Sequence, residues 1–189
     1  MMKTIKVLGI CGSLRRQSTN MNLLRYAQEH APSGMQIEIA DLSAVPFYNA
    51  DIAEKPAAVQ TLLSKIGEAD ALLLACTEYN YSMAPALKNA LDWASREPDN
   101  HLMVGKPAAI MGAGGGMGTS RAQYHLRQVC VFLDLHVLNK PEVFCNAFSG
   151  SFDQNGKLVD ERIQELISTQ LSAFQSWTNK VCATEKSIA

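Results

Sequence analysis

One polar stretch of this chain carries side chains suited to binding a phosphate. Residues 12–20 follow an apolar run and precede a helix-like segment. Their hydrogen-bonding side chains are those of Ser13, Arg15, Ser18, Thr19 and Asn20. Hydroxyl and amide donors, a guanidinium and the free N–H groups of a helix start are the usual partners of a bound phosphate. The alternative interpretation is a polar turn in which Thr19 or Asn20 caps the helix.

A second stretch, residues 77–82, suits a flat heteroaromatic ligand. It follows the apolar run at 71–76 and contains Glu78, Tyr79, Asn80 and Tyr81. A planar ring binds best against aromatic or backbone walls, with polar groups along one edge. Taken alone, the same residues could be ordinary aromatics at the rim of the core beside a solvated carboxylate.

A third stretch, residues 112–118, has five glycines among its seven residues. Dense glycine lets backbone N–H groups approach a ligand closely, so Gly112, Ala113, Gly114 and Gly115 are predicted to contact the edge of the ring. The dinucleotide pattern G-x-G-x-x-G is not met, because Met117 stands where its third glycine would be. The alternative is a flexible connection with no ligand.

Strand-like and helix-like segments alternate along the whole chain. Strands are expected at 5–11, 35–40, 70–76, 106–111 and 137–145, the last of them interrupted at 139–141, and helices at 21–30, 56–68, 83–96, 120–135 and from Asp160. This alternation predicts a single α/β domain over residues 1–189. We expect a flavodoxin-like, doubly wound, five-stranded parallel sheet in the order 2-1-3-4-5, with helices on both faces.

That strand order places the first two polar stretches beside the switch point between the first and third strands, where open α/β sheets bind ligands. A phosphate at one loop and a planar ring at the next indicate a mononucleotide, with flavin mononucleotide (FMN) as the leading candidate.

Composition excludes several classes of protein. The net charge of −1 gives no reason to expect nucleic acid as a partner, and no run is long and apolar enough for a membrane span. The N-terminal residues do not resemble a signal peptide, so we expect a soluble, cytoplasmic protein. The five cysteines include no C-x-x-C pair, so no metal site or dithiol redox motif is expected.

Three groups of residues resemble the NADPH-dependent FMN reductase family, whose flavodoxin-like members include quinone reductases, chromate reductases and azoreductases. They are Gly-Ser-Leu-Arg-x-x-Ser-x-Asn at 12–20, Glu-Tyr-Asn-Tyr-Ser at 78–82 and Leu-Lys-Asn-Ala-Leu-Asp-Trp at 87–93. Residues 121–128 and 139–142 resemble the bacterial quinone and chromate reductase branch. The likeness covers about residues 5–175. The chain departs from it at Thr77, where the family usually has proline, and in its more glycine-rich third stretch.

The resemblance implies bound FMN, with its phosphate at Ser13, Arg15, Ser18 and Asn20 and its ring lined by residues 78–81. It implies NADPH or NADH as co-substrate and hydride transfer through FMN to quinones, flavins, azo compounds or metal oxyanions such as chromate. No side chain is expected to act as an obligatory acid or base.

The family also implies homodimers or homotetramers, with Arg121, Tyr124 and Glu142 either in a contact between subunits or solvated on one subunit. The competing functions are a flavodoxin-type electron carrier and an FMN-binding sensor, neither of which turns over NADPH. Flavodoxins are usually strongly acidic, and a net charge of −1 speaks against the carrier. A hydrolase lacks support because no Gly-x-Ser-x-Gly sequence is present.

Overall fold

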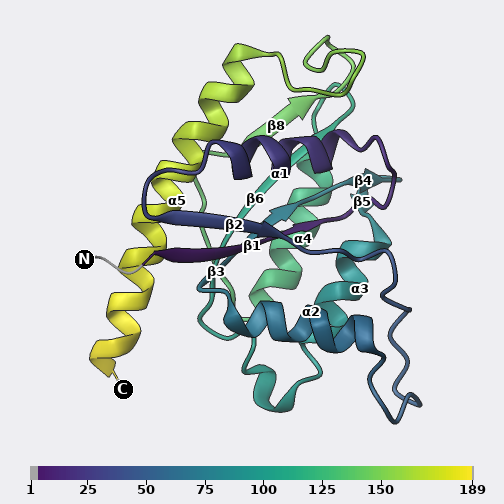
Figure 1. The fold of residues 1–189 in the computed structure, drawn as a ribbon, viewed down its shortest axis with the longest axis vertical. Coiled ribbons are helices and arrows are strands. Elements are labelled where there is room, and N and C mark those ends of the chain that lie inside the picture. Colours follow the sequence, from purple (N-terminus) through teal and green to yellow (C-terminus); the bar gives the residue numbers. More distant parts are fainter. Residues whose placement is uncertain (1–3, 189) are drawn as a thin grey trace.

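The computed structural model describes residues 4–188, which form a central parallel sheet with helices on both faces (Figure 1). The strands of this sheet are β1 (Ile5–Cys11), β2 (Met35–Ile39), β3 (Ala71–Ala75), β6 (Pro107–Gly114), β7 (His136–Val137) and β8 (Val143–Asn146). The helices are α1 (Thr19–Glu29), α2 (Ala57–Glu68), α3 (Pro85–Ala94), α4 (Ser120–Phe132) and α5 (Glu161–Ile188), with a short 3-10 helix η1 (Pro98–Asn100). A separate antiparallel hairpin joins β4 (Glu78–Tyr79) to β5 (Ser82–Met83). None of the helices in residues 4–188 is both long and apolar enough to cross a membrane.

The order of the sheet is β2-β1-β3-β6, with β7 and β8 both pairing with β6. The predicted flavodoxin-like order 2-1-3-4-5 is therefore confirmed. The fifth strand, predicted over 137–145 with an interruption at 139–141, consists of two short strands. β7 pairs with the start of β6 and β8 with its end. Pro141, which lies between them, has no N–H to donate to a continuous ladder.

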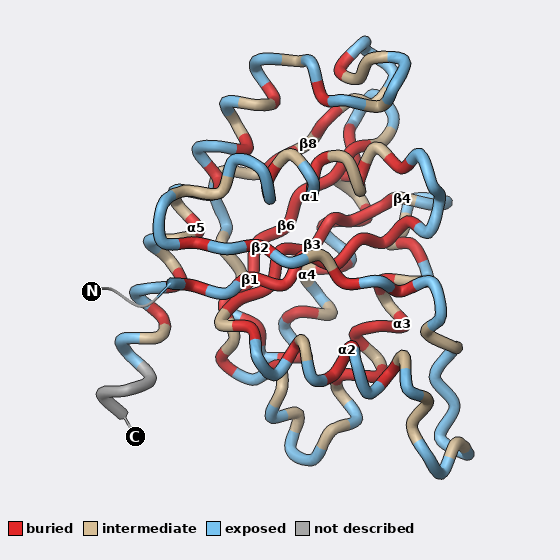
Figure 2. The backbone as a smooth tube through the Cα atoms, in the orientation of Figure 1, coloured by how far each residue is buried: buried red, intermediate tan, exposed pale blue. Residues whose placement is uncertain are grey.

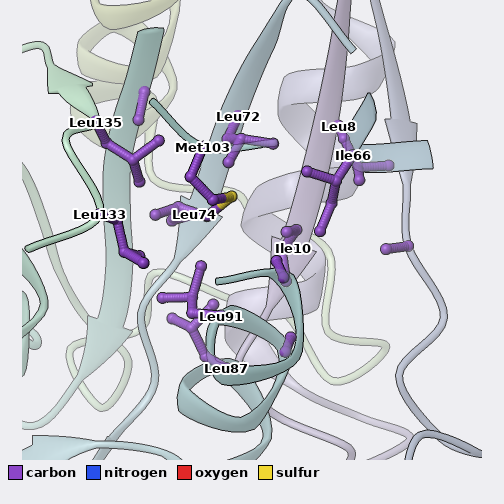
Figure 3. Packing of buried hydrophobic residues seen from close by; sticks show 14 of the residues in the cluster. Leu8, Ile10, Ile66, Leu72, Leu74, Leu87, Leu91, Met103, Leu133 and Leu135 are labelled. Atoms are coloured by element: carbon purple, nitrogen blue, oxygen red, sulfur yellow. The ribbon is translucent and has the colours of Figure 1, made fainter. Parts of the chain in front are cut away.

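The core forms two layers because successive strand residues point to opposite faces of the sheet. The most buried parts of the backbone are the central strands (Figure 2). On one face, α2, α3 and α4 cover side chains that include Leu8, Ile10, Leu72 and Leu74 (Figure 3). On the other face, α1 and α5 cover a second cluster, which contains Phe174. β3 is buried along its whole length, as expected for a central parallel strand. The rigid sheet fixes where the loops at its carboxyl edge can lie.

Two buried thiols should be almost inert. Burial raises the pKa of the Cys76 thiol to about 12, with a smaller contribution from the charge of Glu78, and burial also raises the pKa of Cys130 to about 12. Only about one thiol in 10,000 is then ionised at pH 8, and the thiolate is the reactive form. We expect native protein treated with a thiol reagent at pH 8 to label half-buried Cys182 well before either of them. Peptide mapping measures this, with protein unfolded in guanidinium chloride as the control. Rapid native labelling of Cys76 or Cys130 would contradict the packing described.

Candidate active site

The first predicted loop joins β1 to α1, and two serines organise it. Ser18 is the N-cap of α1, and its Oγ accepts a hydrogen bond from the Met21 N–H at 3.2 Å. Ser13 Oγ accepts the Arg15 N–H at 3.3 Å. Both serines are buried, whereas Arg15 is exposed. The loop therefore does contain a helix cap, as the alternative interpretation predicted. The capping residue is Ser18, not Thr19 or Asn20.

This loop also presents a group of backbone donors with no partner. Within residues 4–188, no hydrogen bond uses the N–H groups of Leu14, Arg16, Gln17, Ser18, Thr19 and Asn20. Buried N–H groups nearly always have a partner, and Ser18 and Asn20 are buried. Unpaired amides at a helix start, where the helix dipole is positive, form a site for an anion. The exposed guanidinium of Arg15 adds a full positive charge, so the loop fits a phosphate.

The side chain of Asn20 connects the loop to strand β6. Its Nδ2 donates to the Ala113 carbonyl at 2.8 Å, and its Oδ1 accepts the Ala113 N–H at 2.9 Å. Both residues are buried. The amide therefore ties the start of α1 to β6. The Ala113 N–H is already paired, so Ala113 has no free amide to offer a ring. Asn20 can offer a phosphate its backbone N–H and the second N–H of its Nδ2.

The second predicted loop is the β4–β5 hairpin. Its two central residues have positive φ, 51° at Asn80 and 65° at Tyr81, which is the mark of a type I′ hairpin turn. Asparagine adopts this conformation readily, but tyrosine does so at a cost in backbone strain. The guanidinium carbon of Arg121 lies 3.9 Å from the centre of the Tyr81 ring, and this cation–π contact with α4 holds the strained residue in place.

Glu78 anchors the same hairpin to the first turn of α4. Its carboxylate accepts hydrogen bonds from Arg121 Nε at 3.1 Å and from the Ala122 N–H at 3.2 Å. The Glu78 side chain is only 10% exposed, and a carboxylate at a helix N-terminus is stabilised by the unpaired N–H groups and the helix dipole. Glu78 was predicted to line the ring of the ligand. In the structure it also fixes the hairpin to α4. Tyr79 is half exposed and Tyr81 more so, which leaves both rings accessible.

The third predicted loop starts later than expected, because β6 runs to Gly114 and not to residue 111. Gly112, Ala113 and Gly114 are strand residues paired with β8. A Cβ at Gly112 would lie 1.9 Å from Thr119 Oγ1 and 2.7 Å from the Cys76 carbonyl, and one at Gly114 would lie 2.4 Å from the Gly118 carbonyl. These glycines allow the residues before α4 to pack directly on β6. The prediction that Gly112 and Gly114 belong to a loop is wrong.

The part of this segment that remains open is residues 115–117. A Cβ added at Gly115 or Gly116 would meet nothing within 4 Å, and both residues are exposed. Their backbone can therefore approach a ligand. β1 pairs with β3 and β3 with β6, all in parallel, so residues 12–20, the hairpin and residues 115–117 follow three neighbouring strands at one edge of the sheet.

The sequence matches known proteins over most of its length. Residues 5–150 match the family described as NADPH-dependent FMN reductase. The chain belongs to the NADPH-dependent FMN reductase family. It is 53% identical over 180 residues to the NAD(P)H-dependent FMN reductase PA1204 of Pseudomonas aeruginosa, covering 94% of this chain and 97% of that protein. The NAD(P)H:quinone oxidoreductase of Solanum tuberosum is 48% identical over 94% of each chain.

Solved structures agree with this assignment. FerB, a flavoenzyme NAD(P)H:(acceptor) oxidoreductase from Paracoccus denitrificans, superposes with a TM-score of 0.85 at 30% sequence identity, over 93% of this chain and 98% of FerB. FMN is therefore the expected cofactor of this FMN reductase and NAD(P)H its expected co-substrate. The cluster of unpaired amides in the first loop fits the phosphate of FMN.

Sequence reasoning missed two residues near this site. Asn89 and Trp93, both on α3, hold the segment around Pro46 by hydrogen bonds from their side chains. Asn89 is a polar residue at a buried position of a helix, and this pattern indicates that its side chain has a hydrogen-bond partner. The pattern does not reveal which distant segment supplies that partner.

Proposed function

We propose that this FMN reductase passes two electrons from NAD(P)H, through FMN, to quinones. The observation that carries the proposal is the set of six unpaired N–H groups between Leu14 and Asn20, beside the exposed tyrosines of the hairpin. The phosphate would bind these amides and Arg15, with Ser13 and Ser18 placing them. The ring would lie against the hairpin and the open backbone at Gly115.

The side chains in this proposal bind and orient; none acts as an acid or base. When bound, FMN supplies the hydride and electron transfer chemistry, and the protein orients it and tunes its potential. Glu78 and Arg121 keep the hairpin rigid by fixing it to α4. Backbone N–H groups of Gly116 and Met117 would stabilise negative charge at the edge of the reduced ring, whereas Gly115 pairs with Gly118.

Quinones are the proposed acceptors because the potato relative is named for quinone reduction and FerB is an acceptor oxidoreductase. Flavins, azo compounds and metal oxyanions such as chromate complete the proposed range, since exposed tyrosines and glycines form a site open on one side. NADPH and NADH are both proposed as donors. Because these nucleotides are held within cells, the proposed location is the cytoplasm.

Steady-state oxidation of NADPH, with FMN added and 2-methyl-1,4-naphthoquinone as acceptor, tests this function. The proposal predicts turnover that requires both FMN and the quinone. An electron carrier or FMN-binding sensor would bind FMN and leave NADPH unchanged, which would overturn the proposal.

We also propose a homodimer or homotetramer with Arg121, Tyr124 and Glu142 near the subunit contact. Within one chain, the Tyr124 hydroxyl lies 3.4 Å from Glu142 Oε1, and Lys140 forms an ion pair with the same carboxylate. The Tyr124 side chain is nevertheless 54% exposed, which leaves it accessible to a second subunit.

Replacing Glu142 with alanine should shift the oligomer towards smaller species, because the carboxylate that organises Tyr124 and Lys140 is lost. Sedimentation velocity at several protein concentrations measures the shift. The control is Glu165→Ala, which removes an exposed carboxylate from α5. An unchanged sedimentation profile for Glu142→Ala would remove this residue from the contact.

A further inference from the structure

The segment between β2 and α2 is irregular, but α3 holds it firmly at one point. Asn89 Oδ1 accepts the Tyr48 N–H at 2.8 Å, and Asn89 Nδ2 donates to the Pro46 carbonyl at 2.9 Å. Trp93 Nε1 donates to the same carbonyl at 2.8 Å. The Tyr48 ring packs edge-on against Trp93, with 5.1 Å between ring centres. Long irregular segments in compact domains are commonly functional, and this one has a fixed backbone on both sides of Phe47.

Phe47 lies at the edge of a cavity of about 270 Å³. The apolar residues that line the cavity include Leu14, Val45, Phe47, Tyr79, Pro85 and Ala86. Three of them are large and strongly exposed: Leu14 by 60%, Phe47 by 74% and Tyr79 by 50%. Exposed apolar side chains gathered around a hollow mark a surface that binds an apolar ligand.

The size and position of the cavity restrict the ligand. Pockets for drug-sized molecules usually measure about 300–1,000 Å³, so this cavity suits one or two fused rings and is too small for a whole dinucleotide. Its walls include Gly12, Leu14 and Arg15 of the phosphate loop and Tyr79 of the hairpin. A molecule bound there would therefore lie against the same segments that are proposed to hold FMN. A small aromatic electron acceptor meets both conditions.

We propose that this cavity binds the ring of a quinone acceptor, that Phe47 is a specificity-determining wall of it, and that Asn89 is the positioning residue that holds the wall. The inference rests on the proposed function and deepens it, because it names the residues that would favour an apolar, ring-shaped acceptor over a hydrophilic one. Asn89 itself lines the cavity, and its side chain also fixes the backbone of Pro46 and Tyr48 on both sides of Phe47.

The test compares an apolar with a hydrophilic acceptor, using FMN-loaded protein and saturating NADPH. The acceptors are 2-methyl-1,4-naphthoquinone and ferricyanide. For Phe47→Ala we expect the ratio of kcat/KM for the quinone to kcat/KM for ferricyanide to fall about tenfold, mainly through a higher KM for the quinone, because an aromatic contact is lost. The matched control is Phe132→Ala on α4, whose side chain is equally exposed, at 74%, and lies outside this cavity.

Asn89→Leu should produce the same rise in quinone KM with a smaller change in kcat, because Phe47 is present but no longer held and the cavity wall at position 89 is altered. A purely structural role for Asn89 would lower thermal stability without this split between KM and kcat. If the unsubstituted protein fails to oxidise NADPH with the quinone, the proposed function itself is wrong. If it turns over but Phe47→Ala and Phe132→Ala give the same acceptor ratio, the inference about the cavity is wrong. A loss of FMN binding in Phe47→Ala would also overturn it, by assigning Phe47 to the cofactor.

Discussion

The Kd for FMN should rise about thirtyfold when Arg15 is replaced with alanine. A charge-assisted hydrogen bond to a phosphate contributes about 1.5–3 kcal/mol, and each 1.4 kcal/mol corresponds to a tenfold change in Kd. Arg15 is the exposed guanidinium next to the buried Ser13 and the unpaired amides of the loop. The amides and the helix start remain in the variant, so binding should weaken without being abolished.

Quenching of FMN fluorescence during titration with flavin-free protein measures this Kd directly. Arg16→Ala is the matched control, since Arg16 is the exposed neighbour and carries the same charge. If general electrostatic attraction were responsible, both variants would lose affinity equally and high salt would remove the difference. Unchanged affinity in Arg15→Ala would exclude Arg15 from the phosphate site.

The free energy of unfolding should fall by about 3 kcal/mol when Asn20 is replaced with leucine. The substitution removes two hydrogen bonds to Ala113, at 2.8 and 2.9 Å. It also leaves the buried N–H and carbonyl of Ala113 without partners, and each such group costs about 1–3 kcal/mol. The added apolar surface offsets part of this loss, so about 3 kcal/mol is the expected net effect.

Urea denaturation followed by circular dichroism measures the change. Asn22→Leu is the control, because Asn22 lies on the same helix, is only half buried and accepts a hydrogen bond from Arg25 alone. Asn20→Leu should also weaken FMN binding, since the start of α1 loses its tie to β6. Equal stability of the two variants would show that the Asn20 contact with Ala113 does not hold the loop.

Much of the fold follows from local patterns. The spacing of apolar residues identified the strands and helices, including the buried strand β3. Their alternation predicted the parallel sheet and its strand order, because the rules for connecting strands allow few topologies. The three segments of the candidate site were also visible in sequence, as polar or glycine-rich residues placed after β1, β3 and near the end of β6. The interruption of the fifth strand was also expected, because Pro141 marks it.

The roles of single residues depend on contacts between segments far apart in sequence. Asn20 has the residue type of a helix cap, but its side chain bonds Ala113, 93 residues away. Gly112 resembles part of a ligand-binding loop in the sequence. In the structure a glycine is needed there because Thr119 packs too close to leave room for a side chain. Asn89 holds a segment 41 residues away. Local sequence signals carry no information about such partners, so these roles need the three-dimensional structure.

The absorbance of FMN-loaded protein under anaerobic conditions tests the central claim most directly. After removal of unbound FMN, NADPH is added and the visible flavin band is followed, and a quinone is then added to the same sample. The account predicts that the band bleaches with NADPH and returns with the quinone. A bound flavin whose band stays unchanged with both NADPH and NADH would contradict it, and would make the protein a carrier or a sensor of FMN instead of a reductase.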